Sequence, residues 1–267
     1  MKTKLLTALI GGLFAASLQA TPIVNDNVRP VMVNGAPGSE ASLQSILNGL
    51  FGPAWGNVHV NQSTAGQWGA ATGSATTIPT LHWEATSNVD RQRFGMWFGT
   101  DSSNLLFVPL FWGAADDGGH GGGSGEGAPA TAAIQITTGE IEIGSSSFGN
   151  CFGQVNCTWS PITDARISTS SFGFYFETLG GGFSPSRIEY ANSIDNLSGY
   201  GAREQPRFLA FQQGGTSNWA FAYEDGTDYD YNDMVVKVES IQVPLPGTVA
   251  LLGIGLLGAG VARRRRA

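Results

Sequence analysis

The sequence predicts an all-β fold of the β-sandwich or jelly-roll kind, with one short helix near the start of the folded part. Two observations lead to this prediction. Short runs rich in β-branched and aromatic residues recur along the chain, and Gly, Ser, Asn and Thr separate them; glycine alone accounts for 38 of the 267 residues. Many short strands at such spacings are typical of sandwiches and jelly-rolls, whereas βαβ units place a helix between successive strands.

One segment has the periodicity of an amphipathic helix. Its apolar residues recur at i, i+3, i+4 and i+7, and they are Leu43, Ile46, Leu47 and Leu50. Ser39 is the expected N-cap, because a serine hydroxyl can accept a hydrogen bond from the first free backbone amides. Gly52 lies near the expected end of the helix.

The remaining apolar runs are the expected strands. They cover residues 80–84, 94–98, 105–112, 134–136, 141–143, 172–177, 208–211, 219–223 and 234–238. A Gly-rich stretch, residues 113–129, interrupts the series and is the best candidate for a boundary. We therefore expect an N-terminal Trp-rich β region over residues 21–129 and a C-terminal β domain over residues 130–242.

Five of the seven tryptophans lie in the first half of the chain: Trp55, Trp68, Trp83, Trp97 and Trp112. Exposed tryptophans can stack on sugar faces, which would make this region a carbohydrate-binding surface. Trp83, Trp97 and Trp112 are instead spaced like successive strands, which is typical of core residues. We favour the core interpretation.

The first 20 residues have the layout of a secretory signal peptide. Lys2 and Lys4 precede an apolar stretch over residues 5–16, and Ala20 is a small residue at the expected cleavage point. An apolar stretch of about a dozen residues is short for a membrane span. The segment therefore predicts export of the chain.

The other end of the chain is also apolar and ends in a basic cluster. Residues 248–262 carry no charge and would rise about 22 Å as a helix, less than the hydrocarbon core of about 30 Å. The flanking residues on the two sides are Val243, Pro244, Leu245, Pro246 and Gly247, and then Arg263, Arg264, Arg265 and Arg266. The basic cluster predicts that this end stays on the cytoplasmic side while the rest of the chain lies outside.

This tail, residues 243–267, resembles the PEP-CTERM sorting signal of Gram-negative exoproteins, with Leu245 where the family usually has Glu. The resemblance implies passage through the inner membrane as an intermediate and processing there by a sorting protease, an exosortase. It also implies that the protein is then released or attached at the cell surface.

Charge excludes one class of partner. Six of the 14 Lys and Arg lie in the two end segments, which leaves 8 against 21 Asp and Glu in residues 21–242, a net charge of −13. Such an acidic surface repels nucleic acid, so nucleic-acid binding is not expected, and it suits cation binding.

Two cysteines, Cys151 and Cys157, lie six positions apart. In an oxidising compartment we expect them to form one disulfide that closes a small loop. A metal-binding pair is the alternative, but two cysteines without a nearby histidine are too few for a zinc site.

The densest polar cluster is residues 224–233, directly before the last long strand. Its oxygen-bearing side chains are Glu224, Asp225, Asp228, Asp230, Asn232 and Asp233. In an extended chain, Asp228, Asp230 and Asn232 would share one face. Hard oxygen donors at this density favour Ca²⁺. An EF-hand is excluded because its required Gly is Asp233 here, and a solvated acidic turn without a metal is the alternative.

Residues 171–241 also resemble a family of domains of unknown function found in bacterial exoproteins and large adhesins. The matching motifs are residues 172–175 (Phe-Gly-Phe-Tyr), residues 209–212 (Leu-Ala-Phe-Gln) and the acidic ending, residues 223–235. Tyr223 and Gly226 depart from the family pattern of Phe and Leu. The resemblance implies that the six oxygen-bearing residues of the cluster are the ligand set.

Catalysis is not expected. His59, His82 and His120 are scattered, and no His-Glu-x-x-His or Gly-x-Ser-x-Gly motif is present. The sequence favours an exported surface or extracellular-matrix protein, Ca²⁺-stabilised and structural or adhesive. An exopolysaccharide-binding module is the first alternative. A secreted glycoside hydrolase using acids such as Glu84 and Glu177 is the second.

Overall fold

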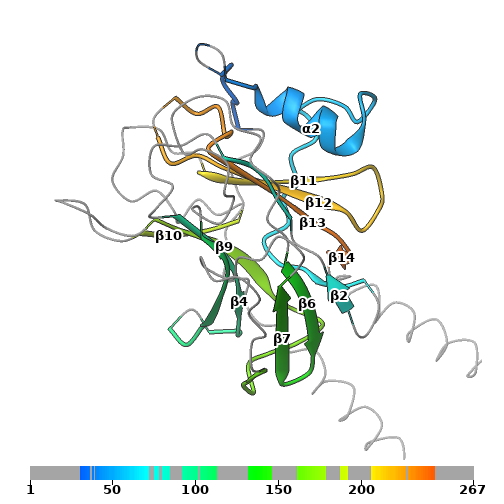
Figure 1. Ribbon diagram of the computed structural model, residues 1–267, viewed down its shortest axis with the longest axis vertical. Coiled ribbons are helices and arrows are strands. Elements are labelled where there is room, and N and C mark those ends of the chain that lie inside the picture. The colour runs from blue at the N-terminus through cyan, green and yellow to red at the C-terminus, as the bar shows by residue number, and fades with distance from the viewer. Residues whose placement is uncertain are drawn as a thin grey trace, which may run out of the picture. The chain divides into compact units, whose positions relative to one another are not determined.

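A computed structural model (Figure 1) describes part of the chain. The described residues are 31–36, 38, 40–71, 75–77, 80–84, 92–101, 103–112, 132–145, 161–178, 187–191, 206–226 and 228–243. All of them belong to one compact unit, Pro22–Val243. The expected signal peptide, the Gly-rich stretch, Cys151, Cys157 and the tail beyond Val243 lie outside the described residues.

The prediction of a mostly β fold is confirmed. Among the described residues the strands form three four-stranded antiparallel sheets and one two-stranded pair. The first sheet has the order β10 (Arg187–Tyr190), β9 (Gly173–Thr178), β4 (Gln92–Phe98) and β5 (Leu106–Trp112). The second has the order β11 (Phe208–Gln212), β12 (Trp219–Tyr223), β13 (Met234–Val238) and β3 (Thr80–Glu84).

The third sheet and the two-stranded pair are smaller. The third sheet has the order β2 (Ala75–Thr77), β6 (Ala132–Thr137), β7 (Glu140–Ser145) and β8 (Ile162–Thr163). The pair is β1 (Gly69–Ala70) with β14 (Ile241–Gln242). All three larger sheets combine strands from before residue 129 with strands from after it. Strands from the two sides of the Gly-rich stretch therefore pair within the same sheets.

The first and second sheets share one aromatic core. Phe174 of β9 packs on Phe221 of β12 with ring centroids 4.5 Å apart, and Trp68 packs edge-on against Phe221 at 5.1 Å. All three side chains are at most 1 % exposed. Aromatic pairs of this kind each contribute about 0.5–1.5 kcal/mol beyond the area they bury. Strand alternation sends every second residue of β11, β12 and β13 into this core.

Helix α2 (Leu43–Phe51) covers the opposite face of the β11–β12–β13 sheet, as Figure 1 shows. Leu43, Ile46 and Leu47 pack there in a second core cluster with residues of β11, β12 and β13. The predicted helix is confirmed, but its N-cap is Ser42 and not Ser39. Ser42 directly precedes the first helical residue, and its hydroxyl accepts a hydrogen bond from the Ser45 amide at 3.3 Å.

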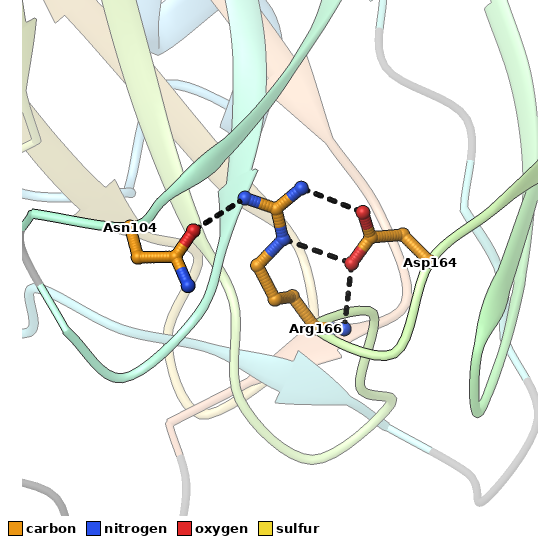
Figure 2. Close-up of polar contacts among 3 residues, drawn as sticks. All are labelled: Asn104, Asp164 and Arg166. Carbon is orange, nitrogen blue, oxygen red and sulfur yellow. Dashed lines mark hydrogen bonds and ion pairs between the residues drawn. The ribbon is translucent and has the colours of Figure 1, made fainter.

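Arg166 holds two loops together on the surface (Figure 2). Its guanidinium donates to both carboxylate oxygens of Asp164, at 2.8 and 2.6 Å, and to the side-chain oxygen of Asn104 at 3.0 Å. These bonds join the β4–β5 connection to the segment after β8. Hydrogen bonding from Arg166 lowers the pKa of Asp164 to about 2.

Candidate metal centre

The acidic loop, residues 224–233, joins β12 to β13, which are adjacent antiparallel strands. Glu224, Asp228 and Asp230 each present a carboxylate oxygen, and these oxygens all lie within 4.8 Å of one another. The pairing of Tyr223 with Met234 closes the loop at its base. The fold therefore brings three of the six expected ligands together; we call these three residues the acidic triad.

Burial is the main property that the sequence did not indicate. Glu224 is 0 % exposed and Asp230 is 1 % exposed, while Asp228 is exposed to solvent. Asn232 and Asp233 are also buried. The alternative of a solvated acidic turn is therefore wrong for most of the loop. A buried carboxylate loses its hydration, which is costly unless a positive charge or hydrogen-bond donors replace it.

The triad is only partly satisfied by hydrogen bonds. Glu224 Oε2 accepts from the Tyr231 amide at 3.3 Å, and Asp230 Oδ1 accepts from the Asn232 amide at 3.3 Å. Glu224 Oε1 and Asp230 Oδ2 are buried and have no hydrogen-bond donor. The ion pairs among the described residues include none of the triad. Two buried oxygens of the loop therefore have no hydrogen-bond donor in the chain, and a cation could satisfy both.

Backbone conformation explains how the carboxylates converge. The sequence suggested an extended loop, but the loop turns, because Tyr229 and Tyr231 have φ values of 59° and 57°. This left-handed region costs a bulky residue about 1–2 kcal/mol. Both tyrosine side chains are buried in the second core cluster, and Tyr231 Oη donates to the Pro206 carbonyl at 2.6 Å. Their packing holds the strained turns that direct Asp228 and Asp230 toward Glu224.

The pKa shifts follow from this environment. Burial raises the pKa of the Glu224 carboxyl, and the charge of Asp228 adds to the rise. Burial also raises the pKa of Asp230 to about 6, with smaller contributions from the charges of Asp228 and Glu40. In both residues the shift comes first from burial and then from the neighbouring carboxylates, which disfavour the ionised form.

The other three expected ligands have structural partners. The Asp225 amide donates to Asp233 Oδ2 at 2.6 Å, and Gln92 Nε2 donates to Asp225 Oδ2 at 2.5 Å. Asn232 Nδ2 donates to the Ala41 carbonyl at 3.0 Å. Burial, and then the charge of Asp225, raise the pKa of Asp233. These contacts brace the base of the loop. Among the carboxylates of the loop, Asp225 and Asp233 are not in the group whose oxygens lie within 4.8 Å of one another.

Sequence reasoning missed one residue that shapes the loop. Arg207, directly before β11, is only 4 % exposed. Its Nη1 donates to the Gly226 carbonyl at 2.5 Å and to the Glu224 carbonyl at 3.4 Å, and its guanidinium lies 5.6 Å from the Tyr229 ring centroid. In the sequence, Arg207 only precedes Phe208 and the apolar strand, and no motif there indicates a contact with the acidic loop.

Comparison with known families identifies a motif at the C-terminal end of the chain. A family model, the PEP-CTERM protein-sorting motif, matches residues 242–266. The chain carries a PEP-CTERM sorting motif. This motif implies that exosortase processes the chain and that the protein is exported to the cell surface. The expected C-terminal sorting signal is therefore confirmed. Neither the curated proteins nor the solved structures give a match to the chain.

The PEP-CTERM motif begins at the last residue of β14 and does not include the acidic loop. The resemblance of residues 171–241 to a domain family therefore stays a prediction. In the part of the chain that the structure describes, no helix has the length and apolar character needed to cross a membrane. Because the motif implies export, it also implies that the acidic loop lies outside the cell.

Proposed function

We propose that this protein is a non-catalytic surface or matrix component with a structural or adhesive role, whose β domain is stabilised by Ca²⁺ bound to the acidic triad. One observation carries the proposal: Glu224 Oε1 and Asp230 Oδ2 are buried without a donor, in a group of three carboxylates. A divalent cation satisfies both oxygens and neutralises the charge that burial disfavours.

The donor set supports Ca²⁺ over other metals. Zinc prefers nitrogen and sulfur ligands, and Mg²⁺ is usually held by one or two carboxylates together with water. Ca²⁺ takes six to eight oxygens at about 2.3–2.6 Å, so oxygens on opposite sides of one ion lie about 4.6–5.2 Å apart. The triad oxygens, all within 4.8 Å of one another, are compatible with this spacing. Asp228 is exposed, so water can complete the coordination.

The surroundings support a structural role more than catalysis or sugar binding. The triad lies in a connection between adjacent strands, and Tyr229 and Tyr231 of the same loop are buried in the second core cluster. Of the three tryptophans expected in the core, Trp97 is fully buried, and the side chains of Trp83 and Trp112 lie outside the described part of the structure. Trp68 and Trp219 are also at most 1 % exposed, so neither they nor Trp97 offer a sugar-stacking surface. Glu177, one of the acids considered for glycoside hydrolysis, forms an ion pair with Arg93 at 3.3 Å. These observations favour a domain that cation binding stabilises.

The expected stabilisation is modest. Ca²⁺ that binds only the folded chain adds RT ln(1 + [L]/Kd), which is about 0.4–1.4 kcal/mol at millimolar Ca²⁺ for a Kd of about 10⁻⁴–10⁻³ M. For a chain of this size that corresponds to a rise in Tm of about 1–6 °C.

Thermal melts of the exported protein, in millimolar Ca²⁺ and in EDTA, test the proposal. The variant Asp228→Ala/Asp230→Ala removes two triad carboxylates. The control Glu140→Ala/Glu142→Ala removes the same charge from β7. We expect a Ca²⁺-dependent rise in Tm for the wild type and the control, and no rise for the triad variant. Identical melts in Ca²⁺ and EDTA for all three proteins would contradict the site.

A further inference from the structure

The sorting motif begins inside the folded part of the chain. It covers residues 242–266, and Gln242 is the second residue of β14. Gln242 pairs with Gly69 of β1, and its side-chain Nε2 donates to the Ala70 carbonyl at 3.3 Å. The first residue of the motif that exosortase processes is therefore part of a β-sheet.

Strand β14 is held firmly in this position. Ile241 is 0 % exposed, its amide donates to the Ser217 carbonyl at 3.1 Å, and its own carbonyl accepts from Trp219 Nε1 at 3.2 Å. The Ala71 amide donates to the Ser240 carbonyl at 2.9 Å. Backbone that is buried and hydrogen-bonded opens less often than exposed loops. The fold therefore holds the chain as far as Gln242.

The chain between β14 and the proline segment of the motif is very short. Val243 alone separates β14 from Pro244, and the proline segment ends at Gly247. Five residues of fully extended chain span at most about 18 Å. Even a domain of about 100 residues has a radius of gyration of about 13 Å. An enzyme that reads this segment therefore comes up against the surface around β14.

That surface differs in charge from the rest of the protein. We call it the β14 corner: it consists of β1, β14 and the segments bonded to them, residues 65–71, 167–172 and 213–219. None of these residues is charged, whereas residues 21–242 as a whole carry a net charge of −13. Lys237 and Glu239, just before β14, form an ion pair at 2.6 Å. Depletion of charged residues is typical of the centre of a protein–protein interface.

The acidic loop lies at the other end of the same strands. Trp219 pairs with Val238 at the β14 corner, and Tyr223 pairs with Met234 at the acidic loop. At about 3.4 Å per residue, the two ends are about 14 Å apart along the strands. The acids of the loop are therefore kept away from the place where the tail leaves the domain.

We propose that the β14 corner is a contact surface for exosortase, which reads the tail while it rests on the folded domain. The partner surface that fits this corner is uncharged and forms hydrogen bonds. Ser170, Thr216 and Gln242 are exposed at the corner, and Val243 is 44 % exposed beside them. This inference does not depend on Ca²⁺, so it can hold or fail whatever the acidic triad binds.

Pulse-chase labelling of the full chain, in cells that contain exosortase, measures the rate at which the tail is processed. Ser170→Glu places a charge on the corner, and Ser45→Glu places the same charge on an exposed residue in the first turn of α2. We expect Ser170→Glu to slow processing about 10-fold or more, because the contact would bury a charge without a partner. Ser45→Glu should be processed like the wild type.

A second corner variant guards against a folding defect. Gln67→Glu keeps the shape of the side chain and the oxygen that accepts from Ser171 Oγ at 3.3 Å, and it adds a charge beside β1. It should slow processing in the same direction as Ser170→Glu. Thermal melts of the exported variants should match the wild type, which shows that the loss lies in processing and not in the fold.

A linker separates contact from simple obstruction. A Gly-Ser insert of about 12 residues between Val243 and Pro244 adds an average reach of about 20 Å, so the enzyme can read the tail away from the corner. With this insert, Ser170→Glu should be processed as fast as the wild type carrying the same insert. Wild-type rates for both corner variants without the insert would overturn the inference. An insert that speeds all the proteins by the same factor and leaves Ser170→Glu slow would overturn it as well.

Discussion

Glu224 accepts a hydrogen bond from the Tyr231 amide through Oε2 and leaves Oε1 buried without a donor. Tyr231 can donate because its backbone turns through the left-handed region, and its buried ring keeps that conformation in place. The loop thus fixes the position of a carboxylate that it satisfies through only one oxygen. The protonation of this group, and the stability that depends on it, should respond strongly to pH and to cations.

The first prediction concerns the pH dependence of stability in EDTA. Burial raises the folded-state pKa values of Glu224, Asp230 and Asp233 above the value of about 4 expected in the unfolded chain. The folded state then binds more protons than the unfolded state above pH 4, so the free energy of unfolding falls as pH rises. We expect Tm in EDTA to fall between pH 5 and pH 8.

Ca²⁺ should reverse this fall, because it neutralises the ionised triad. The rise in Tm on adding Ca²⁺ should be largest near pH 8 and small near pH 5, where protons compete for the carboxylates. Asp164 does not affect the change in Tm between pH 5 and pH 8. Its pKa is lowered to about 2, so its contribution to stability changes only below pH 4, where it is lost as pH falls. A Tm in EDTA that is constant or rises from pH 5 to pH 8 would contradict the prediction.

The second prediction is that Asp230→Asn stabilises the chain in EDTA. The amide has the shape of the carboxylate but no charge, and it can donate to neighbouring acids. One pKa unit corresponds to about 1.4 kcal/mol, so removing this buried charge should raise the free energy of unfolding at pH 8 by about 1–3 kcal/mol. The same variant should lose the response to Ca²⁺.

Urea unfolding at pH 8, with and without Ca²⁺, measures both effects of Asp230→Asn. Glu142→Gln is the control, since Glu142 is exposed, and it should change neither value. A variant that is less stable than the wild type in EDTA and still gains stability from Ca²⁺ would show that Asp230 is not a ligand.

The acidic triad could be predicted from the sequence only as a region. The density of acids in residues 224–233 indicated the loop that contains the triad, but not which of its acids come together. Burial of Glu224 and the left-handed turns at Tyr229 and Tyr231 could not be read from the sequence, because the packing of the rings imposes them. The contact between Asn232 and Glu40 joins residues about 190 positions apart in the chain, and no local sequence pattern indicates such a contact.

The strands were predicted where the sequence is strongly apolar. Residues 219–223 and 234–238 were expected as strands and match β12 and β13 in full, because these strands are buried on both faces. Five strands were missed because each is only two to four residues long: β1, β2, β8, β10 and β14. Strand β10 also carries the polar residues Arg187 and Glu189. Glu189 is 1 % exposed, so tertiary packing overrides its polar character there.

The third prediction concerns Trp68, which lies outside any long strand. It is fully buried and contacts Phe174, Trp219 and Phe221 with centroid distances of 5.1–5.5 Å. Trp68→Ala should lower the free energy of unfolding by about 3–5 kcal/mol, because a large cavity opens between the two sheets. Trp55 is only partly buried, so Trp55→Ala should cost clearly less. Urea unfolding compares them, and equal losses would contradict a central role for Trp68.

The fourth prediction concerns Gly173 in the Phe-Gly-Phe-Tyr strand. Gly173 pairs with Trp97 of β4, and the indole lies directly on the glycine. A Cβ at this position would lie 2.1 Å from Trp97 Cε2, and Trp97 is fully buried, so it has little room to move. Gly95 receives the Tyr175 ring in the same way. Glycine is therefore required here for close approach of an aromatic ring across the strands.

Gly173→Ala should lower the free energy of unfolding by about 1–3 kcal/mol, the usual cost of overpacking a core. Gly35→Ala is the control, because a Cβ there meets nothing within 4 Å, and it should change stability by less than about 0.5 kcal/mol. Thermal melts of both variants measure the difference. If Gly173→Ala melts like Gly35→Ala, the ring of Trp97 does not lie on this strand, and the glycine serves another purpose than aromatic packing.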